Sequence, residues 1–182
     1  MKKRWYNAED MREPGYSSAD GKKPSKRAAD TKPIVPDHEI LRMIGSGAYG
    51  EVWLARSLTG AHRAVKVVWR EDFENKAQFA QEFEGILHYE PLARDIPGLV
   101  HILHVGKQGG PSPYYFYVME LADDAYTGIH LDPEGYVPRT LQTDMRLYGR
   151  RAMPPDYVLE VGSQLAHALA GLHEEELTHR DV

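Results

Sequence analysis

The sequence predicts an α+β fold, in which β-strands around a glycine-rich loop precede a more helical second half. The first observation is a series of short apolar runs, alternating or rich in valine, that are typical of strands. The second is a single helical pattern between the third and fourth of these runs, and the third is a long amphipathic helix near the end of the chain. The expected strands cover residues 40–44, 51–56, 62–69, 99–103 and 114–119.

The first three expected strands are joined by the glycine-rich loop and by a tight turn. The apolar residues of 40–44 lead directly into the glycines. Residues 51–56 alternate between polar and apolar side chains, which predicts a half-buried second strand. Residues 58–61, Leu-Thr-Gly-Ala, predict a hairpin turn before the valine-rich strand at 62–69.

A helix is predicted over residues 74–88, because its apolar side chains recur at spacings of three and four. These side chains are Phe79, Phe83, Ile86 and Leu87. The two strands that follow it are separated by a Gly-Gly-Pro turn at residues 109–111.

The second half of the chain is expected to be mainly helical. Prolines interrupt residues 123–150, where only 140–148 predict a helix. The clearest helix is predicted over residues 156–175, after Pro154 and Pro155, which favour a helix start. Its apolar stripe consists of Val158, Val161, Leu165, Leu169 and Leu172. We expect this stripe to be exposed and to make the chain alone prone to aggregation.

The composition restricts the class of protein and its partners. The 182 residues include no cysteine, which excludes disulfides and thiolate metal sites. No run approaches the roughly 18 apolar residues of a membrane span, so we expect no membrane segment and a cytoplasmic location. Residues 1–37 contain nine Lys and Arg against six Asp and Glu, whereas residues 38–182 carry a net charge of −8. We expect 1–37 to be a disordered basic tail and the acidic remainder not to bind nucleic acid.

The most informative motif is Gly45-Ser46-Gly47-Ala48-Tyr49-Gly50-Glu51-Val52, which Lys66 follows sixteen residues after Gly50. Its place between two expected strands disfavours a dinucleotide-binding site of the Rossmann type, which requires a strand followed by a helix. No Gly-Lys-Ser/Thr sequence follows, which excludes a Walker A loop. Between two strands, glycines allow backbone N–H groups to approach phosphates closely. Taken alone, the loop could equally be a glycine-rich hairpin without chemical significance.

Lys66 stands in the apolar third strand, within Ala64-Val65-Lys66, where an unpaired lysine is rarely buried. Together with the glycine loop, this sequence resembles the protein kinases, specifically the bacterial relatives of the eukaryotic Ser/Thr family. The resemblance covers residues 38–182, about the first half of a kinase domain. It implies a kinase N-lobe and hinge over 38–122, with a five-stranded antiparallel sheet and one αC-type helix. Residues 123–182 would then form the start of an incomplete helical C-lobe.

The resemblance also assigns roles to individual residues. Lys66 would hold the α- and β-phosphates of ATP and pair with a glutamate of the helix. Glu82 is the best match for this glutamate, and Glu84 is the alternative. Met119 matches the gatekeeper position, and Glu120 and Ala122 would offer backbone groups to adenine. The complete set of expected nucleotide-binding residues is Ile44, Gly45, Ser46, Gly47, Ala48, Tyr49, Gly50, Val52, Ala64, Lys66, Met119, Glu120 and Ala122.

His179-Arg180-Asp181 matches the catalytic-loop signature of the same family. The match implies that Asp181 accepts the proton of the substrate hydroxyl, which makes Asp181, Lys66 and Glu82 the expected catalytic residues. Glu176 departs from the family pattern, which usually has a glycine that allows a left-handed helix cap.

The expected cofactors are ATP and Mg²⁺. The Asn and Asp-Phe-Gly residues that hold Mg²⁺ in the family do not occur before the last residue, Val182, so no metal ligand is assigned. We therefore expect a protein serine/threonine kinase, which transfers phosphate from ATP to a protein hydroxyl. As an incomplete domain, this chain is expected to be inactive alone. The alternative is a non-catalytic module that binds a nucleotide or another protein.

Overall fold

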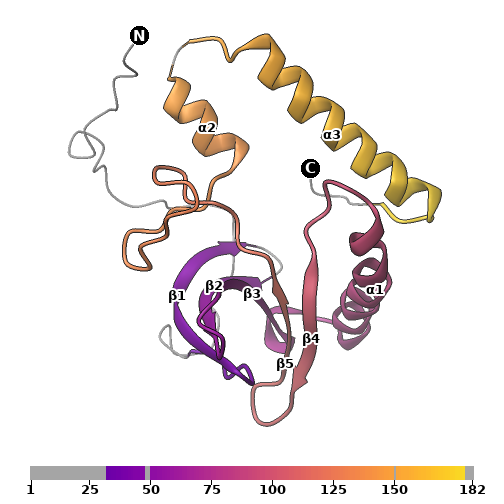
Figure 1. The fold of residues 1–182 in the computed structure, drawn as a ribbon. Helices are drawn as coiled ribbons and strands as arrows, with labels where there is room; N and C mark the ends of the chain where they lie inside the picture. Colours follow the sequence, from indigo (N-terminus) through magenta and orange to yellow (C-terminus); the bar gives the residue numbers. More distant parts are fainter. Residues whose placement is uncertain (1–31, 48–49, 150, 179–182) are drawn as a thin grey trace.

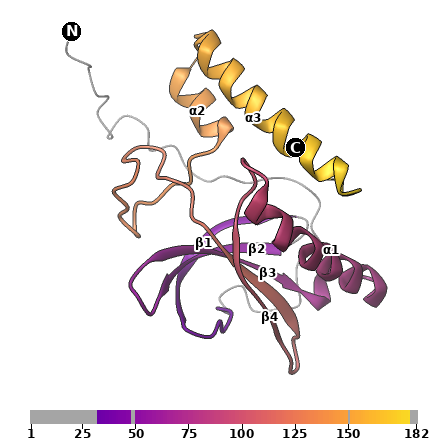
Figure 2. The same cartoon turned by 45° about the vertical axis from the view of Figure 1, so that its right-hand side comes forward.

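The computed structural model describes residues 32–47, 50–149 and 151–178. Five antiparallel strands form one sheet in the order β1-β2-β3-β5-β4, with helix α1 on one of its faces (Figure 1). Helices α2 and α3 lie beyond one end of the sheet (Figure 2). The strands are β1 His38–Gly47, β2 Gly50–Ser57, β3 His62–Trp69, β4 Ile102–Gln108 and β5 Tyr114–Met119; the helices are α1 Lys76–Asp95, α2 Leu141–Tyr148 and α3 Pro155–Glu174, with a short 3₁₀ turn at Arg70–Asp72. The predicted α+β class is confirmed.

The two faces of the sheet carry two separate hydrophobic clusters, as the alternation of side chains along a strand requires. The cluster on the face away from α1 consists of Val35, Trp53, Ala55, Val65, Val67, Trp69, Tyr114, Phe116 and Val118. The cluster under α1 consists of Val68, Phe73, Phe83, Ile102, Tyr115 and Tyr117, with partly buried neighbours such as Phe79 and Met119. The second face is therefore the one that α1 covers.

Aromatic side chains hold α1 on the sheet. The ring of Phe83 lies edge-on to that of Tyr115, with centroids 5.1 Å apart, and Phe79 contacts the same tyrosine at 5.2 Å. The helix begins after Asn75, whose side chain accepts the N–H of Ala77 at 2.8 Å.

Helix α1 is longer than the sequence predicts, because it passes through Pro91 and ends at Asp95 rather than near residue 88. A proline inside a helix removes one of its hydrogen bonds, so its presence favours an earlier end. The extra turn buries Ala93 completely, which offsets this loss.

The start of β4 also differs from the prediction. Residues 99–101 form the approach to the strand, which begins at Ile102 and extends to Gln108. The loop before it turns at Gly98, where φ is +92°. Within the strand, Gly106 is required by packing, because a Cβ there would lie 2.4 Å from Cζ of Phe116. Residues 106–108, Gly-Lys-Gln, contain no β-branched or aromatic side chain, so their pattern does not predict a strand.

The packed part of the described chain includes Lys32 and the residues after it, within the segment that we assigned to the N-terminal tail. Val35 is buried in the cluster on the face away from α1. The hydroxyl of Tyr114 donates to the carbonyl of Ile34 and accepts its N–H, both at 2.8 Å. The ammonium of Lys32 donates to the carbonyl of Leu41 at 2.9 Å. Residues 1–31, for which we expect disorder, lie outside the described residues.

Helix α2 agrees with the prediction, with Thr140 as its N-cap. The Thr140 hydroxyl accepts the N–H of Thr143 at 3.1 Å, and the Thr143 hydroxyl accepts the N–H of Thr140 at 2.7 Å, which forms a capping box.

Helix α3 agrees with the prediction to within one residue at each end. Its apolar stripe is only partly exposed, which corrects our expectation. Leu172 is buried, whereas Val158 and Leu165 are exposed. No described helix is long and apolar enough to cross a membrane.

Candidate nucleotide site

The glycine-rich loop is the hairpin between β1 and β2. Gly45 lies opposite Val52 and Gly47 opposite Gly50 in the antiparallel register. Gly50 adopts φ +126°, and a Cβ there would lie 2.4 Å from the carbonyl oxygen of Val67, so the fold requires glycine. A Cβ at Gly47 would meet no atom of the residues that the structure describes within 4 Å, its chain neighbours aside. Packing therefore does not explain Gly47, whereas close approach of a ligand would.

Two of the predicted site residues, Ala48 and Tyr49, lie outside the described residues. Ile44 and Ser46 lie on β1, on the strand that leads into the loop. Their role at a nucleotide site stays a prediction.

The sheet register brings the remaining strand residues of the predicted site to one face. Lys66 of β3 lies opposite Val52 of β2 and Tyr117 of β5. Ala64 lies two residues before Lys66 and opposite Met119. Since alternate residues of a strand point to the same face, all five share the face that α1 covers. Ala64 is buried, and Lys66 is partly buried.

Lys66 and Glu82 both lie near Tyr117. The ammonium of Lys66 lies 5.9 Å from the centroid of the Tyr117 ring. Burial, and then the charges of Tyr89 and Glu82, raise the pKa of the Tyr117 hydroxyl well above its usual value. The structure thus brings Glu82 of α1 and Lys66 of β3 into the surroundings of one aromatic side chain. The predicted ion pair between them stays a prediction.

The hinge follows β5 and exposes a specific set of backbone groups. The N–H of Glu120 donates to the carbonyl of His101 at 3.2 Å. The carbonyl of Ala122 accepts the hydroxyl of Tyr136 at 3.0 Å. Among the hydrogen bonds of the described residues, the carbonyl of Glu120 and the N–H of Ala122 have no partner within the protein. One acceptor and one donor, two residues apart, complement the N6 amino group and the N1 nitrogen of adenine.

The protonation state of the Tyr136 hydroxyl agrees with its role as donor to the carbonyl of Ala122. Burial and the nearby charge of Asp124 raise the pKa of its hydroxyl to about 12, so the hydroxyl stays protonated and donates to Ala122. The sequence contains one signal for the anchoring of Tyr136, because Arg42 is a charged residue inside the apolar run of the first strand. Its guanidinium bonds the backbone beside Tyr136. Nothing in the local sequence around Tyr136 itself indicates a role.

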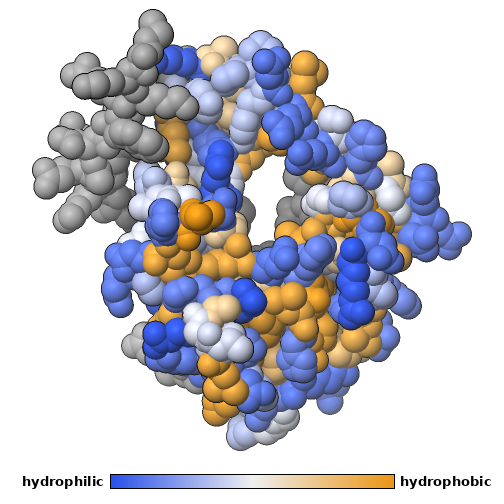
Figure 3. Space-filling model, viewed as in Figure 1, coloured by the Kyte–Doolittle hydropathy of each residue, from blue (hydrophilic) through white to orange (hydrophobic). Residues whose placement is uncertain are grey.

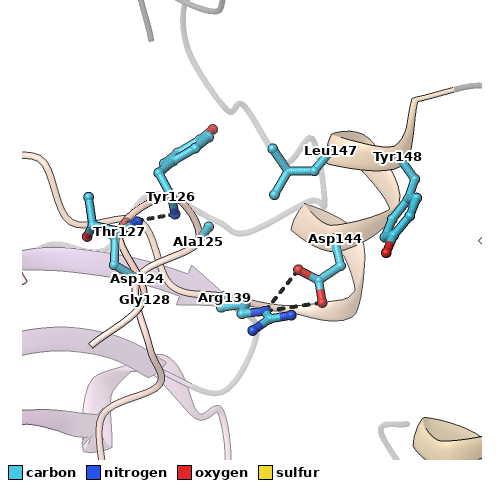
Figure 4. Close-up of a pocket in the computed structure, with 9 residues that line it drawn as sticks. All are labelled: Asp124, Ala125, Tyr126, Thr127, Gly128, Arg139, Asp144, Leu147 and Tyr148. Atoms are coloured by element: carbon cyan, nitrogen blue, oxygen red, sulfur yellow. Dashed lines mark hydrogen bonds and ion pairs between the residues drawn. The ribbon is translucent and has the colours of Figure 1, made fainter. Parts of the chain in front are cut away.

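A cavity of about 480 Å³ lies between residues 124–128 and α2 (Figure 4). Asp124 and Asp144 are buried in its walls. Asp124 accepts backbone N–H groups of Tyr126, Thr127 and Val137 at 2.8–2.9 Å. Asp144 accepts the guanidinium of Arg139 at 3.1 Å and the hydroxyl of Tyr157. Both carboxylates are thus satisfied within the protein, and we assign them a structural role.

The predicted base, Asp181, lies outside the described residues. Helix α3 ends shortly before it, at Glu174. Within the ranges 32–47, 50–149 and 151–178, no group of three or more His, Cys, Asp or Glu side chains is placed to hold a metal ion.

Comparison with known proteins finds similar sequences over most of this chain. The chain is similar to the serine/threonine-protein kinase PrkC of Bacillus subtilis, with 23% identity over 151 residues that cover 83% of this chain and 20% of PrkC. It is 30% identical over 157 residues to the serine/threonine-protein kinase PknB of Mycobacterium leprae, covering 84% of this chain and 22% of PknB. The Aurora/IPL1-related protein kinase 2 of Caenorhabditis briggsae is also 30% identical, over 149 residues that cover 81% of this chain and 42% of that kinase. The chain thus spans less than half the length of these relatives.

Solved structures agree in fold. One structure of the kinase domain of PknI from Mycobacterium tuberculosis matches with a TM-score of 0.57 and 22% identity, covering 86% of this chain and 56% of that one. Another structure of the same domain matches with a TM-score of 0.55 and 22% identity, covering 81% and 51%. The family described as protein tyrosine and serine/threonine kinase matches residues 38–182, most of the sequence. The resemblance stated from the sequence is thereby confirmed, and the chain belongs to the protein kinase family.

Proposed function

We propose that this chain forms the ATP-binding part of a protein serine/threonine kinase, which transfers phosphate from ATP to a protein hydroxyl. The observation that carries the proposal is the sheet register, which brings Val52, Lys66 and Met119 to one face between the glycine hairpin and the Glu120–Ala122 hinge that follows β5 in the sequence. The similarity to bacterial serine/threonine kinases supports Ser/Thr specificity. A cytoplasmic location remains part of the proposal.

Each part of the site has a chemical role in this proposal. The hinge would bind adenine through the carbonyl of Glu120 and the N–H of Ala122. Lys66 would hold the phosphates, and Glu82 would orient Lys66. Bound Mg²⁺ would supply charge neutralisation at the transferred phosphate. Asp181 is proposed as the group that accepts the proton of the substrate hydroxyl.

Binding of a fluorescent ATP analogue to the 182-residue chain tests this proposal. We expect saturable binding that weakens by about tenfold or more in Lys66→Met, because the substitution removes a cation that contacts phosphate. Lys76→Met is the matched control, since Lys76 lies exposed at the start of α1, and it should bind like the original chain. Gly47→Ala should also weaken binding without lowering stability, because its Cβ would meet no atom of the described part of the chain within 4 Å, its chain neighbours aside.

Equal binding by the original chain and Lys66→Met would contradict the assigned site. Absence of saturable binding in the original, folded chain would contradict the proposed function itself. The non-catalytic alternative predicts binding without phosphate transfer, so a transfer assay with radiolabelled ATP distinguishes it from a kinase once binding is established.

A further inference from the structure

Residues 123–139, which follow the hinge, are bound to the first strand of the sheet. Arg42 of β1 extends from the strand that leads into the glycine loop. Its Nε donates to the carbonyl of Pro133 at 2.7 Å, and its Nη2 donates to the carbonyl of Tyr136. The side chain of Tyr136 is almost completely buried, with 2% exposed. Arg42 thus fixes the backbone at Tyr136 and limits where the phenol ring can lie.

The hydroxyl of Tyr136 reaches the hinge itself. It donates to the carbonyl of Ala122 at 3.0 Å. Further bonds close the segment on itself: the N–H of Ala125 donates to the carbonyl of Val137 at 2.8 Å, and the N–H of Arg139 donates to that of Asp123 at 2.9 Å. The hydroxyl therefore occupies one hinge carbonyl from a well-anchored position.

The occupied carbonyl changes which base the hinge can recognise. Adenine presents a donor, N6, beside an acceptor, N1, whereas guanine presents the acceptor O6 beside the donors N1 and N2. The acceptor of Glu120 and the donor of Ala122 fit the adenine order. Guanine would need carbonyl acceptors for N1 and N2, and the second carbonyl of this stretch is that of Ala122. A backbone carbonyl oxygen has two lone pairs, and the Tyr136 hydroxyl already uses one of them. This hydroxyl therefore restricts the directions from which guanine can reach the oxygen and weakens the oxygen as an acceptor.

We propose that Tyr136, held in place by Arg42, is a specificity-determining residue that disfavours guanine nucleotides at the hinge. The inference rests on the proposed function, because it requires that a purine nucleotide binds there. It goes beyond that function in naming residues outside the glycine loop and the hinge that select the base.

The test compares dissociation constants of fluorescent ATP and GTP analogues for the 182-residue chain and three variants. In Tyr136→Phe, which removes only the hydroxyl, the ratio of the GTP to the ATP constant should fall by about fivefold to tenfold. Arg42→Met should shift the ratio in the same direction. Tyr114→Phe is the matched control, because the Tyr114 hydroxyl also donates to a backbone carbonyl, that of Ile34 at 2.8 Å, but lies in the hydrophobic cluster on the face away from α1. Its ratio should equal that of the original chain.

The outcomes separate this inference from the proposed function. If the original chain binds ATP and the ratio in Tyr136→Phe stays within about twofold, the inference is wrong and the proposed function stands. An equal fall of the ratio in Tyr114→Phe would also overturn it, since the change would then follow the loss of any buried tyrosine hydroxyl. If the folded original chain binds neither analogue, both fail. If thermal unfolding shows that Tyr136→Phe does not fold, the ratio in Arg42→Met decides.

Discussion

Glu176 adopts a left-handed backbone conformation at the end of α3, with φ +59°. The N–H of Leu177 donates to the carbonyl of Leu172 at 2.9 Å, and the N–H of Glu176 to that of His173 at 3.1 Å. These two bonds define a Schellman motif, in which the left-handed position is usually glycine. The resemblance to the kinase family anticipates this position, and the structure keeps the turn despite the side chain.

Replacing Glu176 with glycine should stabilise the chain. Relief of the left-handed strain is worth roughly 1–2 kcal/mol, and the greater freedom of glycine in the unfolded chain costs about 0.5–1 kcal/mol, so we expect a net gain of about 0.5–1 kcal/mol. Urea unfolding measures this difference. Glu175→Gly is the matched control, because Glu175 has φ −94° and gains nothing from glycine, so it should lower stability. A loss of stability in Glu176→Gly would contradict the strain argument.

Among the elements, the segment after the hinge depends most on buried charge. Burial alone would raise the pKa of Asp124, but hydrogen bonds from the backbone of Val137, Thr127 and Tyr126 hold the pKa below its usual value. Asp144 shows the same balance: burial raises its pKa, and the hydrogen bonds of Arg139 and Tyr157 lower it further than burial raises it. Both carboxylates therefore stabilise the fold in their charged form.

This balance predicts a pH dependence. A pKa that is lower in the folded than in the unfolded state gives stability that is complete above the ordinary value of 3.8 and is lost as the pH falls through the lowered value. At about pH 7, Asp124→Asn should lower the free energy of unfolding by about 1–3 kcal/mol, because Asn offers one neutral acceptor oxygen in place of two charged ones and turns its NH2 group toward a backbone N–H. The difference from the original chain should shrink below about pH 4.

Urea unfolding at several pH values measures this difference. Asp132→Asn serves as the control, since exposed Asp132 accepts a single backbone N–H, that of Glu134 at 3.2 Å, and its loss of charge should have little effect near neutral pH. A cost of Asp124→Asn that does not change between about pH 7 and about pH 3 would contradict the role of the charge.

The elements differ in how far the sequence determines them. The β1–β2 hairpin and β3 could be predicted because their patterns and turn residues are local. The last turn of α1 and the extension of β4 to Gln108 could not, since they depend on the burial of Ala93 and on the contact of Gly106 with Phe116, which are tertiary effects. Lys66 could be identified because it stands within a local sequence motif. The contact of Arg42 with Tyr136 joins residues 94 positions apart, so it is visible only in the structure.

At the scale of the whole molecule, the sheet part and the helices α2 and α3 differ in how much of their apolar surface is buried. The sheet part buries two hydrophobic clusters, whereas α2 and α3 leave apolar side chains exposed. Figure 3 shows an opening between the sheet part and the helices above it. The exposed side chains on the two helices are Leu141, Met145, Leu147, Tyr148, Val158, Leu159 and Leu165. Such a surface favours association.

We therefore expect the isolated chain to self-associate through α2 and α3. Leu159 is 70% exposed, so Leu159→Lys should reduce association without lowering the free energy of unfolding by more than about 0.5 kcal/mol. Light scattering over a range of concentrations measures the association. Glu160→Lys is the control, because it introduces the same lysine at the neighbouring exposed position. Association that is equally strong in the original chain and in Leu159→Lys would place the contact elsewhere.

Because residues 32–37 are attached to the sheet, the packed domain and the matched family model begin at different residues. The matched family model starts at residue 38, but the packed unit already includes the residues before it, since Val35 covers the sheet and Ile34 is bonded to Tyr114. Residues 32–37 lie outside the matched family model, yet they belong to the same folding unit. The physical domain therefore begins before the boundary of the family model, and a domain cut at residue 38 would lose part of its own core.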